Sequence, residues 1–98
     1  MSIADLKATL ADAAPPSGLT QALTALWWVA KGNWEKAHSI AQDTPNSDGA
    51  WVHAHLHRVE GDPDNASYWY SRAGKPASSV SLETEWDQIA SALLSKQD

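Results

Sequence analysis

Three histidines alternate along one short stretch, and histidine is the side chain that most readily binds metal or moves protons near neutral pH. They are His53, His55 and His57, within the run W-V-H-A-H-L-H-R. On a helix, His53 and His57 lie one turn apart on the same face, and His55 points elsewhere. Such a pair can hold a divalent metal, as in zinc proteases. The glutamate that follows the first histidine in those enzymes is absent, because position 54 is alanine.

Two interpretations of these histidines are open. Glu60 continues the same face, but three ligands in line along one helix converge poorly on one ion. A further ligand such as His38 would therefore have to come from another helix. Alternatively, His53 and His57 occupy packing positions and hydrogen-bond between helices. We interpret them as structural and expect neither a metal nor a cofactor. A metal- or small-molecule-binding protein that uses His53, His57 and perhaps His38 is the alternative.

A second set combines an aromatic ring with a cation on a different face of the same stretch. Trp51, His55 and Arg58 fall together there, and they could grip an acidic or aromatic group by stacking and by a guanidinium fork. The structural interpretation is that Trp51 packs under a terminal helix while Arg58 pairs with a nearby carboxylate. Tryptophan and arginine are frequent at binding hot spots. We therefore predict a partner-binding site at Trp51, His55 and Arg58.

Composition narrows the classes of function. The chain has 98 residues, a formal charge of −5, no cysteine and no cluster of lysine or arginine, which argues against nucleic acid or an anionic membrane as the partner. The sequence offers no membrane span and no signal-peptide pattern, so we expect a cytoplasmic protein. It also lacks a nucleophile motif, a glycine-rich phosphate loop and an evident carboxylate pair. We predict that it is not an enzyme.

The elements that must position these residues are helices. Helical spacing of apolar residues and the capping signals between them predict an all-α fold. The clearest signal is the turn Gly61-Asp62-Pro63, where glycine ends one helix and aspartate caps the next. The segment Leu19–Lys31 is apolar nearly all round, and we expect it to be the central helix. Six helices are predicted: Ser2 to about Ala14, Leu19–Lys31, Trp34 to about Gln42, one from near Ala50 capped by Ser47 or Asp48, one after Pro63, and one after Ser81.

Two segments of the chain look alike. A-K-G-N-W-E-K-A and V-E-G-D-P-D-N-A place their glycines, Gly32 and Gly61, 29 residues apart, each followed by a capping residue and then an alanine. Here the chain resembles the tetratricopeptide and Sel1-like helical-repeat families. The positions that carry the resemblance in the second copy are Gly61, Asp62, Ala66, Tyr70, Ala73 and Pro76. The first copy departs from the pattern with Ala41 in place of the large residue.

The resemblance implies antiparallel helical hairpins, with repeat-like units at about 19–44 and 50–76 in a single domain of residues 1–98. Because two repeats leave faces uncovered, we expect the first and last helices to cap them. The termini would then fill part of the groove that such repeats use for ligands. The resemblance also implies a non-enzymatic protein-interaction module that binds a protein or peptide partner. A homodimer whose interface is its only site is a further alternative.

Overall fold

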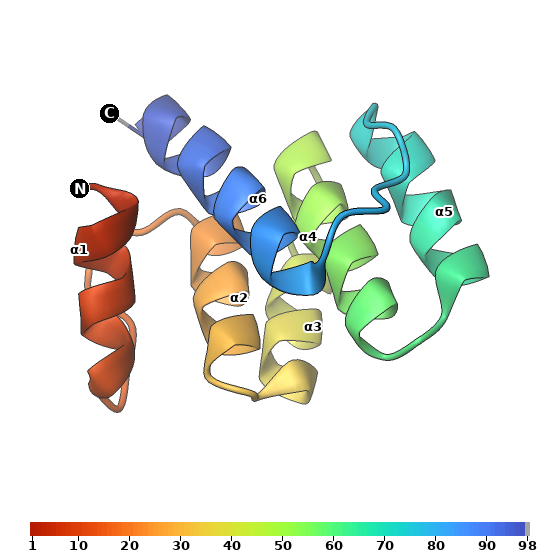
Figure 1. Ribbon diagram of the computed structural model, residues 1–98. Helices are drawn as coiled ribbons and strands as arrows, with labels where there is room; N and C mark the ends of the chain where they lie inside the picture. Colours follow the sequence, from red (N-terminus) through yellow and green to blue (C-terminus); the bar gives the residue numbers. More distant parts are fainter. Residues whose placement is uncertain (98) are drawn as a thin grey trace.

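The computed structural model describes residues 1–97, which form six α-helices and one short 3₁₀ helix (Figure 1). This part of the chain contains no strand, so the prediction of an all-α fold is confirmed. None of the described helices combines the length and the apolar character needed to cross a membrane. The elements are α1 (Ile3–Ala8), η1 (Thr9–Ala11), α2 (Gln21–Ala30), α3 (Trp34–Gln42), α4 (Ser47–Val59), α5 (Pro63–Ala73) and α6 (Leu82–Gln97).

Several helices begin at the caps that the sequence predicts. Ser2 and Asp5 form a capping box at α1, in which each side chain accepts from the backbone N–H of the other residue. Asn33 caps α3, and Asp62 caps α5 with Pro63 in the first turn. Ser81 Oγ accepts from the backbone N–H of Thr84 at 3.1 Å, at the start of α6. These caps satisfy backbone donors that have no partner inside the helix.

Two predicted boundaries are wrong. The first helix ends at Ala8 and continues only as the 3₁₀ turn. Thr9 Oγ1 donates to the Leu6 carbonyl, three residues earlier, at 2.6 Å, which fits the tighter hydrogen-bond spacing of a 3₁₀ helix. Helix α4 begins at Ser47, earlier than predicted, and its cap is Asn46 and not Ser47 or Asp48. Asn46 is extended and its Oδ1 accepts from the backbone N–H of Gly49 at 2.8 Å. The loop before α4 is therefore shorter than its composition suggests.

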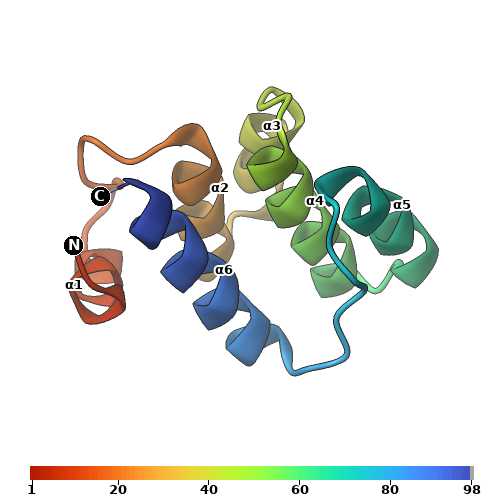
Figure 2. The same cartoon turned by 90° about the horizontal axis from the view of Figure 1, so that it is seen from above.

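Helices α2 to α5 form two hairpins that stand side by side, and α6 crosses one face of them (Figure 1). Gly32 and Gly61 make the two hairpin turns with φ of +79° and +82°, a conformation that strains other residues. Seen from above, α6 packs on α2 and α4, while α3 lies behind them (Figure 2). The first helix packs beside α6. This arrangement is consistent with the predicted antiparallel hairpins, but α6 covers one face of them and not an end.

The helix at the centre of the molecule is α4, which corrects the prediction for Leu19–Lys31. Helix α4 packs against α2, α3, α5 and α6, whereas α2 packs against α3, α4 and α6. Helix α2 does supply several completely buried apolar side chains, including Leu23, Leu26 and Trp27 at 0% exposure. Helix α4 buries alanines and histidines as well as Val52 and Leu56, so its pattern does not look apolar. Its central position therefore requires polar partners inside the fold.

Candidate metal-binding site

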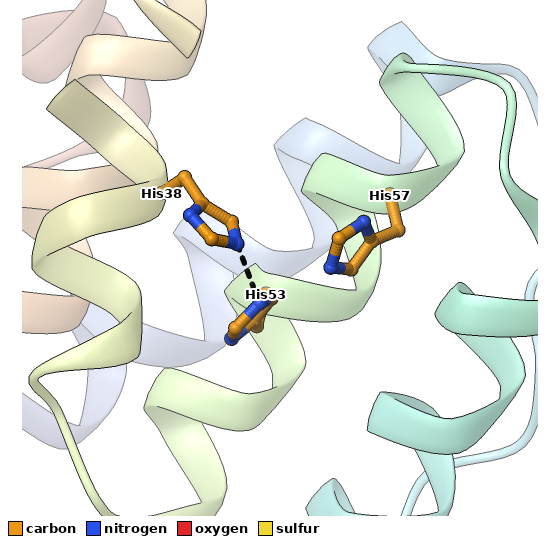
Figure 3. A group of neighbouring side chains, drawn as sticks. All are labelled: His38, His53 and His57. Carbon is orange, nitrogen blue, oxygen red and sulfur yellow. Dashed lines mark hydrogen bonds between the residues drawn. The ribbon is translucent and has the colours of Figure 1, made fainter. Parts of the chain in front are cut away.

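Three of the four histidines meet between α3 and α4. His38 projects from α3, and His53 and His57 project from successive turns of α4 toward it (Figure 3). The spacing of four residues places the last two on one face. The two rings lie 4.9 Å apart between centroids and are nearly parallel, and the His38 ring stands edge-on to His53 at 4.6 Å. His53 and His57 are 3% and 5% exposed, while His38 is half-buried.

The nitrogen atoms of this cluster are close enough to share one ion. His38 Nε2 and His53 Nε2 lie 3.0 Å apart, and one ligand atom from each of the three rings lies within 4.8 Å of the others. A tetrahedral zinc ion with Zn–N bonds of 2.0–2.1 Å separates its nitrogens by about 3.3 Å. The His38–His53 distance is close to this value, and the other distances between ligand atoms are at most 4.8 Å. Figure 3 shows one nitrogen of that ring facing the other two histidines.

Burial favours the uncharged form of these rings, which is the form that binds metal. Burial is the largest cause that lowers the pKa of His53, to about 4, and the neighbouring charges of His38 and His57 act in the same direction. Burial also lowers the pKa of His38, again with a contribution from His57. No proton has to leave His53 at neutral pH before a metal binds. The Nδ1 atom of His53 is buried and has no hydrogen-bond partner among the described residues.

A carboxylate orients the third ring. His57 Nδ1 lies 2.5 Å from Glu60 Oε1, so the ring donates its Nδ1 hydrogen to Glu60 and leaves Nε2 free to face His38 and His53. A histidine that binds metal usually donates its second nitrogen to a carboxylate or carbonyl in this way. Asp62 also comes within ligand range of His57 and Glu60. Its Oδ1 already accepts from the backbone N–H of Asn65 as the cap of α5.

Two indole rings form the walls of the cluster. Trp69 of α5 stacks on His53 with centroids 3.8 Å apart and an interplanar angle of 11°. Trp34 stacks on His38 at 4.7 Å and is itself fixed by a 2.9 Å hydrogen bond from Nε1 to the Leu56 carbonyl. These contacts restrict the rotamers of both imidazoles. Restricted ligands lose little side-chain entropy when they bind an ion.

The partner-binding trio predicted from the sequence lies on the opposite side of α4, against α6. His55 is 1% exposed, so it offers no surface to a partner in this structure. Arg58 Nη1 lies 2.8 Å from Glu85 Oε1, and its Nη2 lies 2.5 Å from the Val80 carbonyl. Trp51 is half-buried, with the Lys75 ammonium 4.3 Å from its ring centroid. The contact itself stays a prediction, and α6 covers this side of α4.

Glu85 of α6 is the residue that ties this side together. It is 2% exposed and accepts from His55 Nδ1 at 2.7 Å, from Arg58, and from the Tyr70 hydroxyl through a short hydrogen bond. Burial alone would raise the pKa of Glu85, but the bonds from His55, Tyr70 and Arg58 outweigh it and hold the pKa below its usual range. Burial and the same carboxylate raise the pKa of Tyr70. Glu85 is therefore an ionised and fully paired buried group.

The sequence suggested His38 only as a ligand that would have to come from another helix, and it missed Glu85 and Glu60 in their present roles. Glu85 lies in the first turn of α6, where the helix dipole alone already favours an acidic residue. The spacing of Glu60 three residues after His57 was the signal that could have identified it as the orienting carboxylate. Comparisons with protein-family models, curated proteins and solved structures found no match for this chain.

Proposed function

We propose that this protein binds a late first-row transition-metal ion through His38, His53 and His57. The observation that carries the proposal is the convergence of three imidazoles from two helices on one point, with ligand atoms within 4.8 Å of one another. Structural histidines commonly hydrogen-bond to carbonyls or carboxylates. Here His38 and His53 face each other, and the second nitrogen of His53 has no partner. An ion at the Nε2 atoms would replace the single contact between His38 and His53 with a bond to each of the three rings.

The ligand set indicates the class of metal. Imidazole nitrogen suits Zn²⁺, Cu²⁺ and Ni²⁺, whereas Mg²⁺ and Ca²⁺ need a shell of oxygen ligands. The three histidines provide three positions of a tetrahedral site, and His38, which is half-buried, leaves one side of the cluster accessible for water as a fourth ligand. The ion would link α3 to α4 and stabilise the hairpins by mass action.

Calorimetric titration of the EDTA-treated protein with Zn²⁺ tests the proposal. We expect one ion per chain and loss of the heat in His38→Ala, His53→Ala and His57→Ala. Ser39→Ala is the matched control, because Ser39 is the exposed neighbour of His38 on α3. Equal heat in the three histidine variants and in the control, or no heat at micromolar zinc, would remove the proposal.

Glu60 supplies a finer test of the same site. Glu60→Gln keeps the size of the side chain but removes the negative charge that accepts the hydrogen of His57 Nδ1. The Nδ1–Oε1 distance of this contact is 2.5 Å. Loss of such an orienting partner typically weakens metal affinity by roughly 10–100-fold. We expect that range in competition titrations with a chelating dye. An unchanged affinity would show that Glu60 does not orient a ligand.

The second candidate is the protein-interaction module that the repeat resemblance implies. One observation favours it: Trp51 borders a hollow of about 170 Å³, beside Lys75, Pro76 and Gln88. A peptide side chain with a carboxylate could stack there against the indole and the ammonium. We expect Trp51→Ala to leave the fold intact and to weaken the binding of a captured partner by about 1–2 kcal/mol or more. Unfolding of Trp51→Ala, or unchanged recovery of the partner, contradicts this candidate.

A further inference from the structure

An apolar hollow lies at the other side of α4, where the ends of α2 and α4 meet the start of α6. Its volume is about 370 Å³, and its walls include Val29, Ala30, Val59, Leu82 and Trp86. Val59 and Leu82 are 40% and 39% exposed, so two of the most exposed large apolar side chains of the described residues border the same depression. Pockets for small molecules begin at roughly 300 Å³, and an apolar cavity of about 150 Å³ already takes up benzene.

One buried polar group also lines this hollow. His55 is 1% exposed and its Nδ1 lies 2.7 Å from Glu85 Oε1. Because Glu85 can only accept at that contact, the His55 ring carries its hydrogen on Nδ1. Its Nε2 has no hydrogen-bond partner among residues 1–97. This nitrogen is also not completely covered by neighbouring atoms. Nε2 is therefore the nitrogen available to a molecule in the hollow.

The charges nearby assign a role to that nitrogen. Arg58 Nη1 lies 2.8 Å from the same oxygen of Glu85 and already balances its charge. Because Glu85 already engages Nδ1, Nε2 is the ring nitrogen left to form a hydrogen bond with a ligand. At the rim, Lys7 Nζ and Asp87 Oδ1 lie 2.8 Å apart, so their opposite charges balance each other. The remaining charged residue that lines the hollow is Glu83, which is negative. A ligand with a negative charge is disfavoured there.

We propose that this hollow binds a small apolar molecule, aromatic or aliphatic, whose one hydroxyl group forms a hydrogen bond with His55 Nε2. The apolar walls take up the body of the molecule, and the buried imidazole selects the hydroxyl group, because an analogue without it leaves Nε2 unpaired. This site is separate from the proposed metal site. Residues two apart on a helix point to nearly opposite sides, so His55 faces away from His53 and His57.

Phenol and toluene are matched probes of this site, since they differ by a hydroxyl and a methyl group. Amide shifts of the isotope-labelled, EDTA-treated protein are followed while each compound is titrated. We expect saturable shifts from phenol at Val29, Ala30, Val59 and Leu82, and roughly tenfold weaker binding of toluene. Equal binding of the two compounds overturns the role of His55. The absence of saturable shifts overturns the site.

Two variants locate the effect. Ala30 is exposed on α2 and lines the hollow, so Ala30→Trp should fill it and abolish the phenol shifts while the helical circular dichroism stays unchanged. Ser39→Trp adds the same ring to an exposed position of α3 and should bind phenol as the wild type does. Phenol shifts that persist in Ala30→Trp place the binding elsewhere and contradict the proposal. The titration uses no metal, so its result is independent of the metal site.

Discussion

The two sides of α4 bury histidines in opposite ways. On the side that faces α6, His55 meets Glu85 at 2.7 Å, and Arg58 and Tyr70 complete the partners of that carboxylate. On the side that faces α3, His53 meets only another imidazole, at 3.0 Å, and its Nδ1 has no partner. One side is an ion-paired network, and the other brings together imidazole rings, of which His38 and His53 have lowered pKa values.

This difference separates a buried polar group whose partners are all present from one that lacks a partner. Buried polar groups normally find partners, and each one that does not requires an explanation. The Glu85 network needs nothing further, since each of its members already has a partner of opposite charge or a donor. The histidine cluster, in contrast, contains a buried ring nitrogen without a partner, His53 Nδ1. The predictions below test this contrast from the largest expected effect to the smallest.

Removing the charge of Glu85 should have the largest effect. In Glu85→Gln, Arg58 and His55 lose their buried acceptor charge, and breaking a buried ion pair from one side costs about 3–5 kcal/mol. We expect a loss of that size in the free energy of unfolding measured with urea. Glu83→Gln, two residues earlier and exposed, is the matched control and should change little. A Glu85→Gln protein as stable as the wild type would show that α6 is not held by this network.

Acid should destabilise the metal-free protein through His53. The folded pKa of His53 is about 4, against 6.5 for an unburied histidine. The unfolded chain therefore binds a proton between these values while the folded chain does not, so stability is complete above pH 6.5 and falls as the pH drops toward 4. The loss should reach about 3 kcal/mol, since one pKa unit is worth about 1.4 kcal/mol.

The same titration distinguishes the two sides of α4. The pKa of Glu85 lies below its usual range, so its contribution is lost only as the pH falls below about 4.5. Urea unfolding in EDTA between pH 7 and 4.5 should therefore report mainly on the histidine cluster. His53→Phe should show a clearly shallower slope in this window. An identical slope in both proteins would mean that His53 is not buried uncharged.

Gly49→Ala should move α3 against α4 without touching a histidine. A Cβ at this position would lie 2.1 Å from the Thr44 carbonyl oxygen, so the loop between the helices has to shift. Alanine normally stabilises a helix over glycine by roughly 0.5–1 kcal/mol, but overpacking of this kind costs about 1–3 kcal/mol. We expect net destabilisation and weaker zinc binding, with exposed Ser47→Ala as the control. A gain in stability would show that the loop tolerates the shift.

The smallest effect is expected at His53 itself, at pH 7 and without metal. In His53→Phe the new ring still stacks on Trp69, and the unpaired Nδ1 is gone. The half-buried His38 can bond to water instead. The free energy of unfolding should therefore stay within about 1 kcal/mol of the wild-type value. His55→Phe removes a partner of Glu85 and should cost about 1–3 kcal/mol. Equal losses in the two variants would remove the contrast between the two sides.

Much of the fold follows from local signals in the sequence. The turns at Gly32 and Gly61 and the caps Asn33 and Asp62 act within a few residues, so the chain alone indicates them. The central position of α4 could not be predicted in this way, because its buried residues are alanines and histidines. Those residues look neutral until their partners are known. The partner of His55 is Glu85, which lies 30 residues later in the chain.

The candidate site was only partly predictable for the same reason. The spacing of His53 and His57 is visible in the sequence, but their approach to His38 depends on how two helices pack across a loop. The prediction of a partner-binding site at Trp51, His55 and Arg58 rests on residue type and helical face. The sequence gives no sign that Glu85, about 30 residues later, pairs with two of its three members.

The coordination shell of bound zinc tests the central claim most directly. X-ray absorption of the protein loaded with one equivalent of Zn²⁺ counts imidazole ligands by their outer-shell scattering. The account predicts three imidazole nitrogens at about 2.0 Å and one further light ligand. In His38→Ala the count should fall to two. A shell of oxygen ligands with one imidazole or none, unchanged in His38→Ala, would contradict a metal site built from His38, His53 and His57.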